Sequence, residues 1–137
     1  NAGEDSVSIL AAMTGTTAAP LREAVVHHSV NGSFAIREGK WKLIFCPDSG
    51  GWSPPKPDSA EARGLPAVQL YDMSDDVGEK QNLYQKYPDV VRRLTGLLER
   101  YVRNGRSSPG IPQKNNYTVA IIRKSTVLNA ISDLNSE

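Results

Sequence analysis

The clearest pattern of apolar and polar positions lies between residues 24 and 46, where short β-prone runs alternate with turn residues. The dipeptide Asn31-Gly32 strongly favours a two-residue hairpin turn, and Glu38-Gly39 predicts a second tight turn. The runs that these turns separate are 24–30, 33–37 and 40–46. The pattern therefore predicts an antiparallel meander of three strands, and residues 68–73 predict a fourth strand.

Two-residue turns would also set the register of the meander, because side chains alternate between the two faces of a sheet. Ser29 would then lie opposite Phe34, and Ile36 opposite both His27 and Trp41. One face would be apolar and would hold Val25, His27, Ser29, Phe34, Ile36, Trp41, Leu43 and Phe45. The other face would be mixed and basic and would hold Val26, His28, Ala35, Arg37, Lys40, Lys42 and Ile44.

A helix that begins at Pro88 is predicted to cover the apolar face. Proline is favoured in the first helical turn, and Asp89 lies at the positive end of the helix dipole. Gly105 is a good C-terminal stop. Between these ends, apolar residues recur at helical spacing, namely Val90, Val91, Leu94, Leu97, Leu98, Tyr101 and Val102. Burial of a leucine-sized side chain contributes about 1.5–3 kcal/mol, so this stripe supplies much of a small core.

The fold class that follows is α+β: a small four-stranded antiparallel sheet packed on one C-terminal amphipathic helix, with a short N-terminal helix and long loops. The N-terminal helix is expected over 5–14, with Asp5 or Ser6 as its cap. Residues 47–66 are rich in Pro and Gly and predict a long loop. After the main helix we expect an irregular tail, with a strand at 119–122 and a short helix at 125–134.

Composition and charge narrow the classes of function. The chain has 137 residues, with 16 Lys and Arg against 15 Asp and Glu, and this near balance argues against a nucleic-acid partner. No apolar run reaches the roughly 20 residues that a membrane span needs. Cys46 is the single cysteine, so an intrachain disulfide or a zinc site built from cysteines is excluded. We interpret Cys46 as a small buried hydrophobe.

A search for catalytic chemistry finds no complete site. His27 and His28 are adjacent, so in a strand they point to opposite faces and do not bind one metal together. His27 is interpreted as a histidine of the core. Asp75-Asp76 is typical of a turn rather than of a cation site, which needs more oxygen ligands. The basic face is open to two interpretations: it binds an anion such as a sulfate ester, or it is solvated or packed on another domain.

Two stretches resemble a known family. Residues 32–43, which read GSFAIREGKWKL, resemble the G-x-F-A-I-R-x-G-x-W-K-L hairpin of arylsulfatase C-terminal domains. Residues 70–83 resemble that family's L-Y-D-L-x-x-D-P-x-E-x-x-N-L signature, with Val77 in the place of the usual proline. By this resemblance, residues 4–115 are a sulfatase C-terminal subdomain. Residues 1–3 are interpreted as a tag remnant and linker, and 116–137 as a tail without an assigned role.

The resemblance implies a parent enzyme that hydrolyses sulfate esters with calcium and a formylglycine, made from the Cys or Ser of a Cys/Ser-x-Pro-x-Arg motif. Cys46 is followed directly by Pro47, and Ser107-Ser108-Pro109 lacks the arginine, so neither matches that motif. We therefore expect no catalytic residue, metal ligand or cofactor in this chain, and no activity from it alone. The parent is expected to be periplasmic or secreted, and no membrane partner is expected.

Within such a parent, the chain is expected to pack on the N-terminal catalytic sulfatase domain and to help wall the substrate cleft. The candidates for contact with a sulfated carbohydrate or aryl sulfate at the rim of the cleft are His27, His28, Asn31 and Trp52. Taken alone, the chain is expected to self-associate weakly through the sheet face that would meet the catalytic domain. Two alternatives stay open: a sulfated-glycan binding module that uses Trp52, and the C-terminal domain of a related phosphatase or phosphonate hydrolase.

Overall fold

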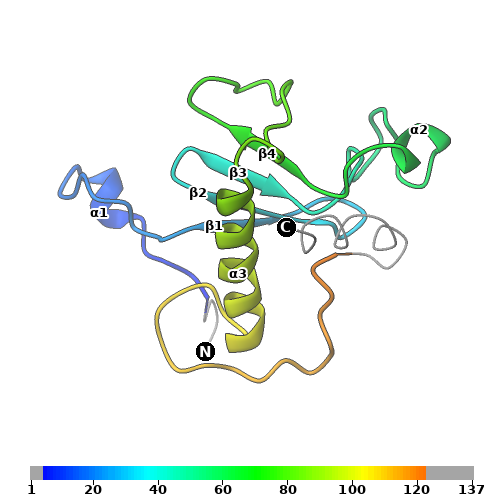
Figure 1. The fold of residues 1–137 in the computed structure, drawn as a ribbon. Helices are drawn as coiled ribbons and strands as arrows, with labels where there is room; N and C mark the ends of the chain where they lie inside the picture. Colours follow the sequence, from blue (N-terminus) through cyan, green and yellow to red (C-terminus); the bar gives the residue numbers. More distant parts are fainter. Residues whose placement is uncertain (1–4, 123–137) are drawn as a thin grey trace.

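The four predicted strands form one antiparallel sheet in the computed structural model, which describes residues 5–122. The sheet follows the order of the chain, with β1 (Val25–His28), β2 (Phe34–Glu38), β3 (Trp41–Ile44) and β4 (Gln69–Asp72) side by side. Helix α3 (Pro88–Asn104) crosses one face of the sheet, and two short helices, α1 (Leu10–Met13) and α2 (Ala60–Arg63), lie to either side (Figure 1). This arrangement confirms the α+β class.

The covering helix forms as its sequence predicts. Pro88 occupies the first turn, and Gly105 ends the helix with a left-handed φ of 61°, which glycine adopts without steric cost. The backbone N–H of Gly105 donates to the carbonyl of Val102 at 3.1 Å. The buried side of α3 consists of Val91, Leu94, Leu97, Leu98 and Tyr101. The predicted apolar stripe is thereby confirmed as the surface that meets the sheet.

One row of aliphatic side chains crosses the whole sheet beneath α3. Val26 lies opposite Ile36, Ile36 opposite Leu43, and Leu43 opposite Leu70. Ile36, Leu43 and Leu70 are fully buried and share one hydrophobic cluster with the helix. The cluster continues the stripe of α3, so the sheet and the helix form a single core.

The register between β1 and β2 differs from the predicted one by one residue. His28 pairs with Phe34, and His27 pairs with Ala35. The reason is the turn: the N–H of Ser29 donates to the carbonyl of Ser33 at 3.0 Å, which leaves a three-residue loop that includes Gly32 at a φ of 82°. A slip of one residue exchanges the faces of the strand. His28 therefore lies on the helix side and His27 on the opposite side, the reverse of the prediction.

The register between β2 and β3 also differs, but by two residues, so no side chain changes face. Glu38 pairs with Trp41, and the tight turn is therefore Gly39-Lys40 rather than Glu38-Gly39. Gly39 has a φ of 56°, which fits this turn position. The predicted helix-side positions on these two strands are confirmed, although Ile36 lies opposite Leu43 rather than Trp41.

Three smaller predictions need correction. Helix α1 is shorter than 5–14 and has no side-chain cap, because the carboxylate of Asp5 accepts hydrogen bonds from Ser107 and Ser108 instead. The long loop 47–66 contains α2, whose N-terminus is capped by Ser59. Residues 119–122 are irregular rather than a strand, and the predicted helix at 125–134 lies outside the described residues.

Candidate functional site

The candidate site is built on two loops at one end of the sheet, which we call the hairpin tip (residues 29–33) and the tryptophan loop (residues 48–55). In the hairpin tip, the side-chain oxygen of Asn31 accepts hydrogen bonds from the hydroxyls of Ser29 and Ser33, each at 2.7 Å. The same oxygen accepts the backbone N–H of Ser33 at 3.0 Å. Asn31 therefore holds the hairpin tip together through its side-chain oxygen.

The tryptophan loop packs directly on the hairpin tip. The backbone N–H of Asn31 donates to the carbonyl of Gly50 at 3.3 Å. Gly50 has a φ of 65°, and a Cβ added there would lie 2.6 Å from the Cβ of Ser29, so only glycine fits this contact. The N–H of Gly50 donates to the buried carboxylate of Asp48 at 2.7 Å. The two loops consequently form one unit.

Strand β4 anchors the tryptophan loop from below. The amide of Gln69 donates to the carbonyls of Cys46 at 2.7 Å and Asp48 at 3.0 Å, and its side-chain oxygen accepts the hydroxyl of Tyr71 at 2.7 Å. Burial raises the pKa of Tyr71, which keeps this hydroxyl protonated as a donor. Cys46 is buried, which confirms its interpretation as a small buried residue, and burial also raises the pKa of its thiol.

Trp52 projects from the tryptophan loop into solvent, with 84% of its surface exposed. The loop is closed beneath it, because the N–H of Ser49 donates to the carbonyl of Pro55 at 3.0 Å and the hydroxyl of Ser49 donates to the carbonyl of Ser53 at 2.6 Å. The structure thus brings the loops of Asn31 and Trp52 together, as the sequence predicts for the end of the sheet.

The two histidines do not join this unit as one group. His28 packs against Phe34, with ring centroids 4.2 Å apart, and lines a hollow of about 400 Å³ between β1 and α3 together with Val26 and Tyr101. His27 is exposed on the opposite side of the sheet, beside Ala35. The interpretation of His27 as a core histidine is therefore wrong, and its cause is the one-residue slip of β1.

The predicted basic face is largely neutralised within the domain. Lys42 forms an ion pair with Glu79, and Lys40 lies 2.6 Å from the carboxylate of Asp72. The hydrogen bond from Lys40, together with one from Ser74, lowers the pKa of Asp72 to about 2. Lys40 and Lys42 thus have internal carboxylate partners and His28 lies on the helix side, while Arg37 is exposed and donates to the carbonyl of Gly39 at 3.1 Å. The four cationic side chains of the predicted face are therefore not gathered as one anion site.

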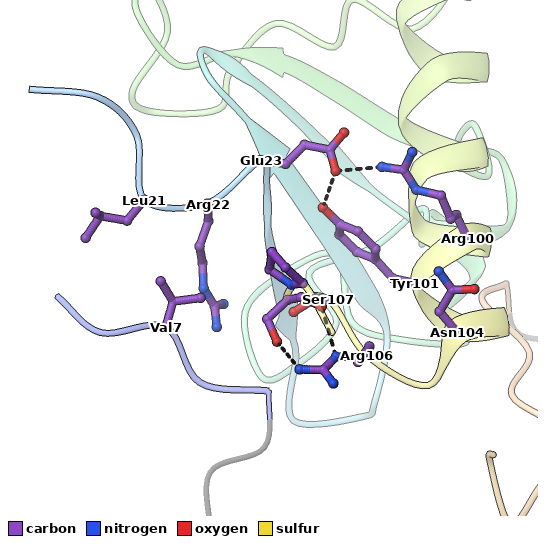
Figure 2. A pocket seen from close by; sticks show the side chains of 11 residues that line it. Val7, Leu21, Arg22, Glu23, Arg100, Tyr101, Asn104, Arg106 and Ser107 are labelled. Carbon is purple, nitrogen blue, oxygen red and sulfur yellow. Dashed lines mark hydrogen bonds and ion pairs between the residues drawn. The ribbon is translucent and has the colours of Figure 1, made fainter. Parts of the chain in front are cut away.

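A second hollow, of about 250 Å³, lies between the segment before β1 and the C-terminal half of α3 (Figure 2). Its polar groups pair with one another: the carboxylate of Glu23 accepts hydrogen bonds from Arg100 at 2.6 Å and from the hydroxyl of Tyr101 at 3.0 Å. The bond from Arg100 lowers the pKa of Glu23. None of the four predicted rim residues lines this hollow.

The acidic pair Asp75-Asp76 belongs to a turn, as predicted. The carboxylate of Asp76 accepts the backbone N–H groups of Lys80 and Gln81, each at 2.8 Å. Within residues 5–122, no group of three His, Cys, Asp or Glu side chains is placed to hold a metal ion.

Sequence features that the prediction missed explain the family signature in residues 70–83. Asn82 binds backbone groups of Val68 and Leu70, and Asp72 accepts hydrogen bonds from Ser74. These residues hold the loop after β4 against the sheet. A local pattern gives no signal for the bonds of Asn82, whose partners lie 12 and 14 positions away, whereas the bond between Asp72 and Ser74 spans two positions and is local.

The fold and the site define a small α+β domain with two interlocked loops at one end of its sheet. A scan against family models finds no match. An N-acetylgalactosamine-6-O-sulfatase of Bacteroides thetaiotaomicron is 37% identical over 81 residues, which are 57% of this chain and 15% of that protein. A solved sulfatase structure, described under the metabolism of multiple glycosaminoglycans by Bacteroides thetaiotaomicron, is 34% identical with a TM-score of 0.55. That match covers 71% of this chain and 20% of the solved one.

These findings agree with the resemblance seen in the two motifs: the chain is similar to two sulfatases over part of its length, as a C-terminal sulfatase domain fragment would be. It spans about a fifth or less of the length of these relatives. Across residues 5–122, no helix has the length and apolar character that a membrane crossing requires.

Proposed function

We propose that this chain is the non-catalytic C-terminal part of a sulfate-ester hydrolase. In this proposal it packs on the catalytic domain of its parent, and the hairpin tip and the tryptophan loop help to wall the substrate cleft. One observation carries the proposal: the chain matches only a small part of each sulfatase, 15% of one and 20% of the other. The part of a sulfatase that lies outside the match is large enough to hold the entire active site.

The surface of α1 supports the existence of a larger partner. Ile9, Leu10 and Met13 are 61%, 65% and 75% exposed, and α1 buries none of its residues. Exposure of three large apolar side chains on one short segment to water is energetically unfavourable. The segment precedes the sheet in the chain, where a preceding domain would join. We propose that the catalytic domain covers this surface in the parent.

The chemistry of the reaction belongs, in this proposal, to the parent. A calcium ion and a formylglycine would supply the sulfate-binding charge and the nucleophile there. The substrate would be a sulfated carbohydrate, the class that the name of the N-acetylgalactosamine-6-O-sulfatase relative indicates for that protein. An exported parent, in the periplasm or outside the cell, fits such a substrate.

The test compares the complete reading frame that encodes this chain with the 137-residue chain alone. The upstream sequence is expected to encode a Cys/Ser-x-Pro-x-Arg motif, and the complete protein is expected to release sulfate from an aryl sulfate and from N-acetylgalactosamine 6-sulfate. The chain alone is expected to release none. Hydrolysis by the isolated chain would contradict the proposal. An upstream region that hydrolyses phosphate or phosphonate esters but no sulfate ester would favour the related phosphatase instead.

A matched pair of variants tests the docking surface. Ile9→Ser with Met13→Ser in the complete protein is expected to weaken the contact between the two parts, seen as a separate, earlier unfolding transition of the C-terminal part. Val77→Ser, at a similarly exposed residue of another loop, is the control and is expected to leave a single transition. Equal unfolding of both variants would remove α1 from the interface.

A further inference from the structure

We propose that Trp52 and Val30 form a platform on which a sugar ring of a sulfated glycan stacks. The platform would give the parent a contact with the carbohydrate itself, separate from any contact with the sulfate group. This inference rests on the proposed function, since it takes the glycan as the substrate of the parent.

The first observation is that Trp52 is exposed on a loop whose backbone is held by hydrogen bonds. The residue is 84% exposed. The loop on which it sits is closed by the backbone bond between Ser49 and Pro55 at 3.0 Å and is tied to the hairpin tip through Gly50. The N–H of Gly51 also donates to the hydroxyl of Ser49 at 3.2 Å. A large indole on a braced loop has little entropy to lose when a flat ligand binds to it.

The second observation is that the apolar surface extends beyond one side chain. A Cβ added at Gly51 would lie 3.3 Å from Cγ1 of Val30, so Val30 lies close to the residue that precedes Trp52. Val30 is itself 65% exposed. An indole beside a small aliphatic group matches a pyranose ring, which has a flat C–H face and a polar edge.

The third observation is the charge around the platform. Across residues 29–33 and 49–57, the only charged side chain is that of Lys56, which is exposed. Two carboxylates flank the segment 49–57: that of Asp48 is buried and accepts the N–H of Gly50, and that of Asp58 is exposed. A sulfated glycan therefore meets no exposed carboxylate from these two segments. The surface favours an anionic sugar over a docking protein that needs charge pairs.

The experiment follows the two indole N–H resonances of the 137-residue chain by NMR. The probes are sulfated glycosaminoglycan oligosaccharides, the same oligosaccharides after desulfation, and sodium sulfate. We expect both oligosaccharides, but not sodium sulfate, to shift the Trp52 resonance. The resonance of Trp41, whose ring packs 4.9 Å from that of Tyr87, serves as the internal reference and is expected not to move.

Two variants measure the fold-change in the affinity for the oligosaccharides. Trp52→Ala is expected to weaken oligosaccharide binding at least about fivefold, the loss expected for one stacked aromatic ring. Tyr117→Ala removes an aromatic residue that is 85% exposed in the segment after α3, and it is expected to leave binding unchanged. Dispersed backbone amide signals from each variant will establish that the fold is kept.

Several results would overturn the platform: an unmoved Trp52 resonance, an equal shift with sodium sulfate alone, or equal binding by Trp52→Ala. The first is the result expected if the catalytic domain, rather than a glycan, covers Trp52 in the parent. Failure of the platform is distinct from failure of the proposed function. If the complete protein hydrolyses sulfate esters while the Trp52 resonance does not move, only the platform is contradicted. If Trp52 binds glycan but the complete protein hydrolyses no sulfate ester, the platform stands and the proposed function is lost.

Discussion

The side-chain oxygen of Asn82 accepts the backbone N–H of Leu70 at 2.9 Å, on the outer edge of β4. The amide of Asn82 donates to the carbonyl of Val68 at 3.1 Å, and the N–H of Leu83 donates to the carbonyl of Leu70 at 2.8 Å. A side chain and one backbone group thereby take the place of a further strand. An open strand edge invites pairing with other chains, and this arrangement closes it.

Asn82→Ala is therefore expected to destabilise the domain by about 1–3 kcal/mol, because it leaves the N–H of Leu70 and the carbonyl of Val68 without their partner. Urea unfolding followed by circular dichroism measures the change. Gln81→Ala is the control: Gln81 is exposed and contributes its backbone N–H, which the substitution keeps. Equal midpoints for the two variants would show that the edge does not depend on Asn82.

Three glycine-to-alanine variants separate backbone strain from a close contact. Gly39→Ala places alanine at a φ of 56° with open space around it, so we expect the cost of a left-handed residue alone, about 1–2 kcal/mol. Gly50→Ala is expected to cost clearly more, because its Cβ also meets Ser29 at 2.6 Å. Gly96→Ala, in the exposed part of α3 with nothing nearby, is expected to stabilise by about 0.5–1 kcal/mol.

The urea unfolding midpoints of these three variants, measured under the same conditions, give the order of their changes in stability. If Gly50→Ala were no more costly than Gly39→Ala, the tryptophan loop would not rest on the hairpin tip as closely as the structure has it.

The adjacent histidines test the register of β1 directly. His28→Ala removes the ring that packs 4.2 Å from that of Phe34, and it is expected to cost about 0.5–1.5 kcal/mol. Both histidines are exposed, but His27 lies on the face away from α3, so His27→Ala is expected to stay within about 0.5 kcal/mol of the parent sequence. Thermal or urea unfolding checks both. A larger loss of stability for His27→Ala than for His28→Ala would favour the register that two-residue turns predict.

The sequence predicts the elements of this fold well and their alignment less well. Pro88, Gly105 and the stripe between them define α3 because each signal is local to the helix. The register of β1 depends instead on whether Asn31-Gly32 closes a loop of two residues or three. That choice is made by Asn31, whose side-chain oxygen gathers Ser29 and Ser33, and by the packing of Gly50 on the tip. Neither contact is visible in a hairpin pattern.

In the candidate site, too, some features follow from the local sequence and others depend on distant residues. The exposure of Trp52 follows from its place among Pro, Gly and Ser residues, and the structure leaves the ring in solvent. The assignment of His27 and His28 to faces was reversed, because one residue of register decides it. The internal partners of Lys40 and Lys42 come from residues more than thirty positions away in the chain, so the neutralised basic face was beyond a local analysis.

Acid is expected to destabilise the domain through Asp72. The hydrogen bonds from Lys40 and Ser74 hold its folded pKa at about 2, below the ordinary value of 3.8. Because the unfolded chain takes up the proton first, this contribution is complete above about pH 4 and is lost as the pH falls toward 2. The lowered pKa values of Glu23 and Asp76 act in the same direction.

Asp72→Asn tests this assignment. The variant is expected to be less stable than the parent sequence at pH 7, where the charge on Asp72 pairs with Lys40, and the difference is expected to disappear near pH 2. Urea midpoints at a series of pH values measure it. A difference that persists unchanged at pH 2 would mean that Asp72 acts through packing rather than through its charge.

Weak self-association of the 137-residue chain is the last expectation, and the structure moves its origin from the sheet to α1. On the sheet face away from α3, Ala35 and Tyr71 are already buried, so this face offers less apolar surface than the sequence implied. Ile9, Leu10 and Met13 remain exposed together. Sedimentation velocity over a concentration series is expected to show a rapid monomer–dimer exchange, because one short apolar segment is far smaller than a stable interface.

Ile9→Ser with Met13→Ser is expected to leave only monomer, whereas Val77→Ser, at a comparably exposed residue, is expected to behave like the parent sequence. The same double variant weakens docking in the complete protein under the proposed function, so the two measurements are linked: a surface that the catalytic domain covers is not available to a second copy. A dimer that survives the double variant would place the contact elsewhere.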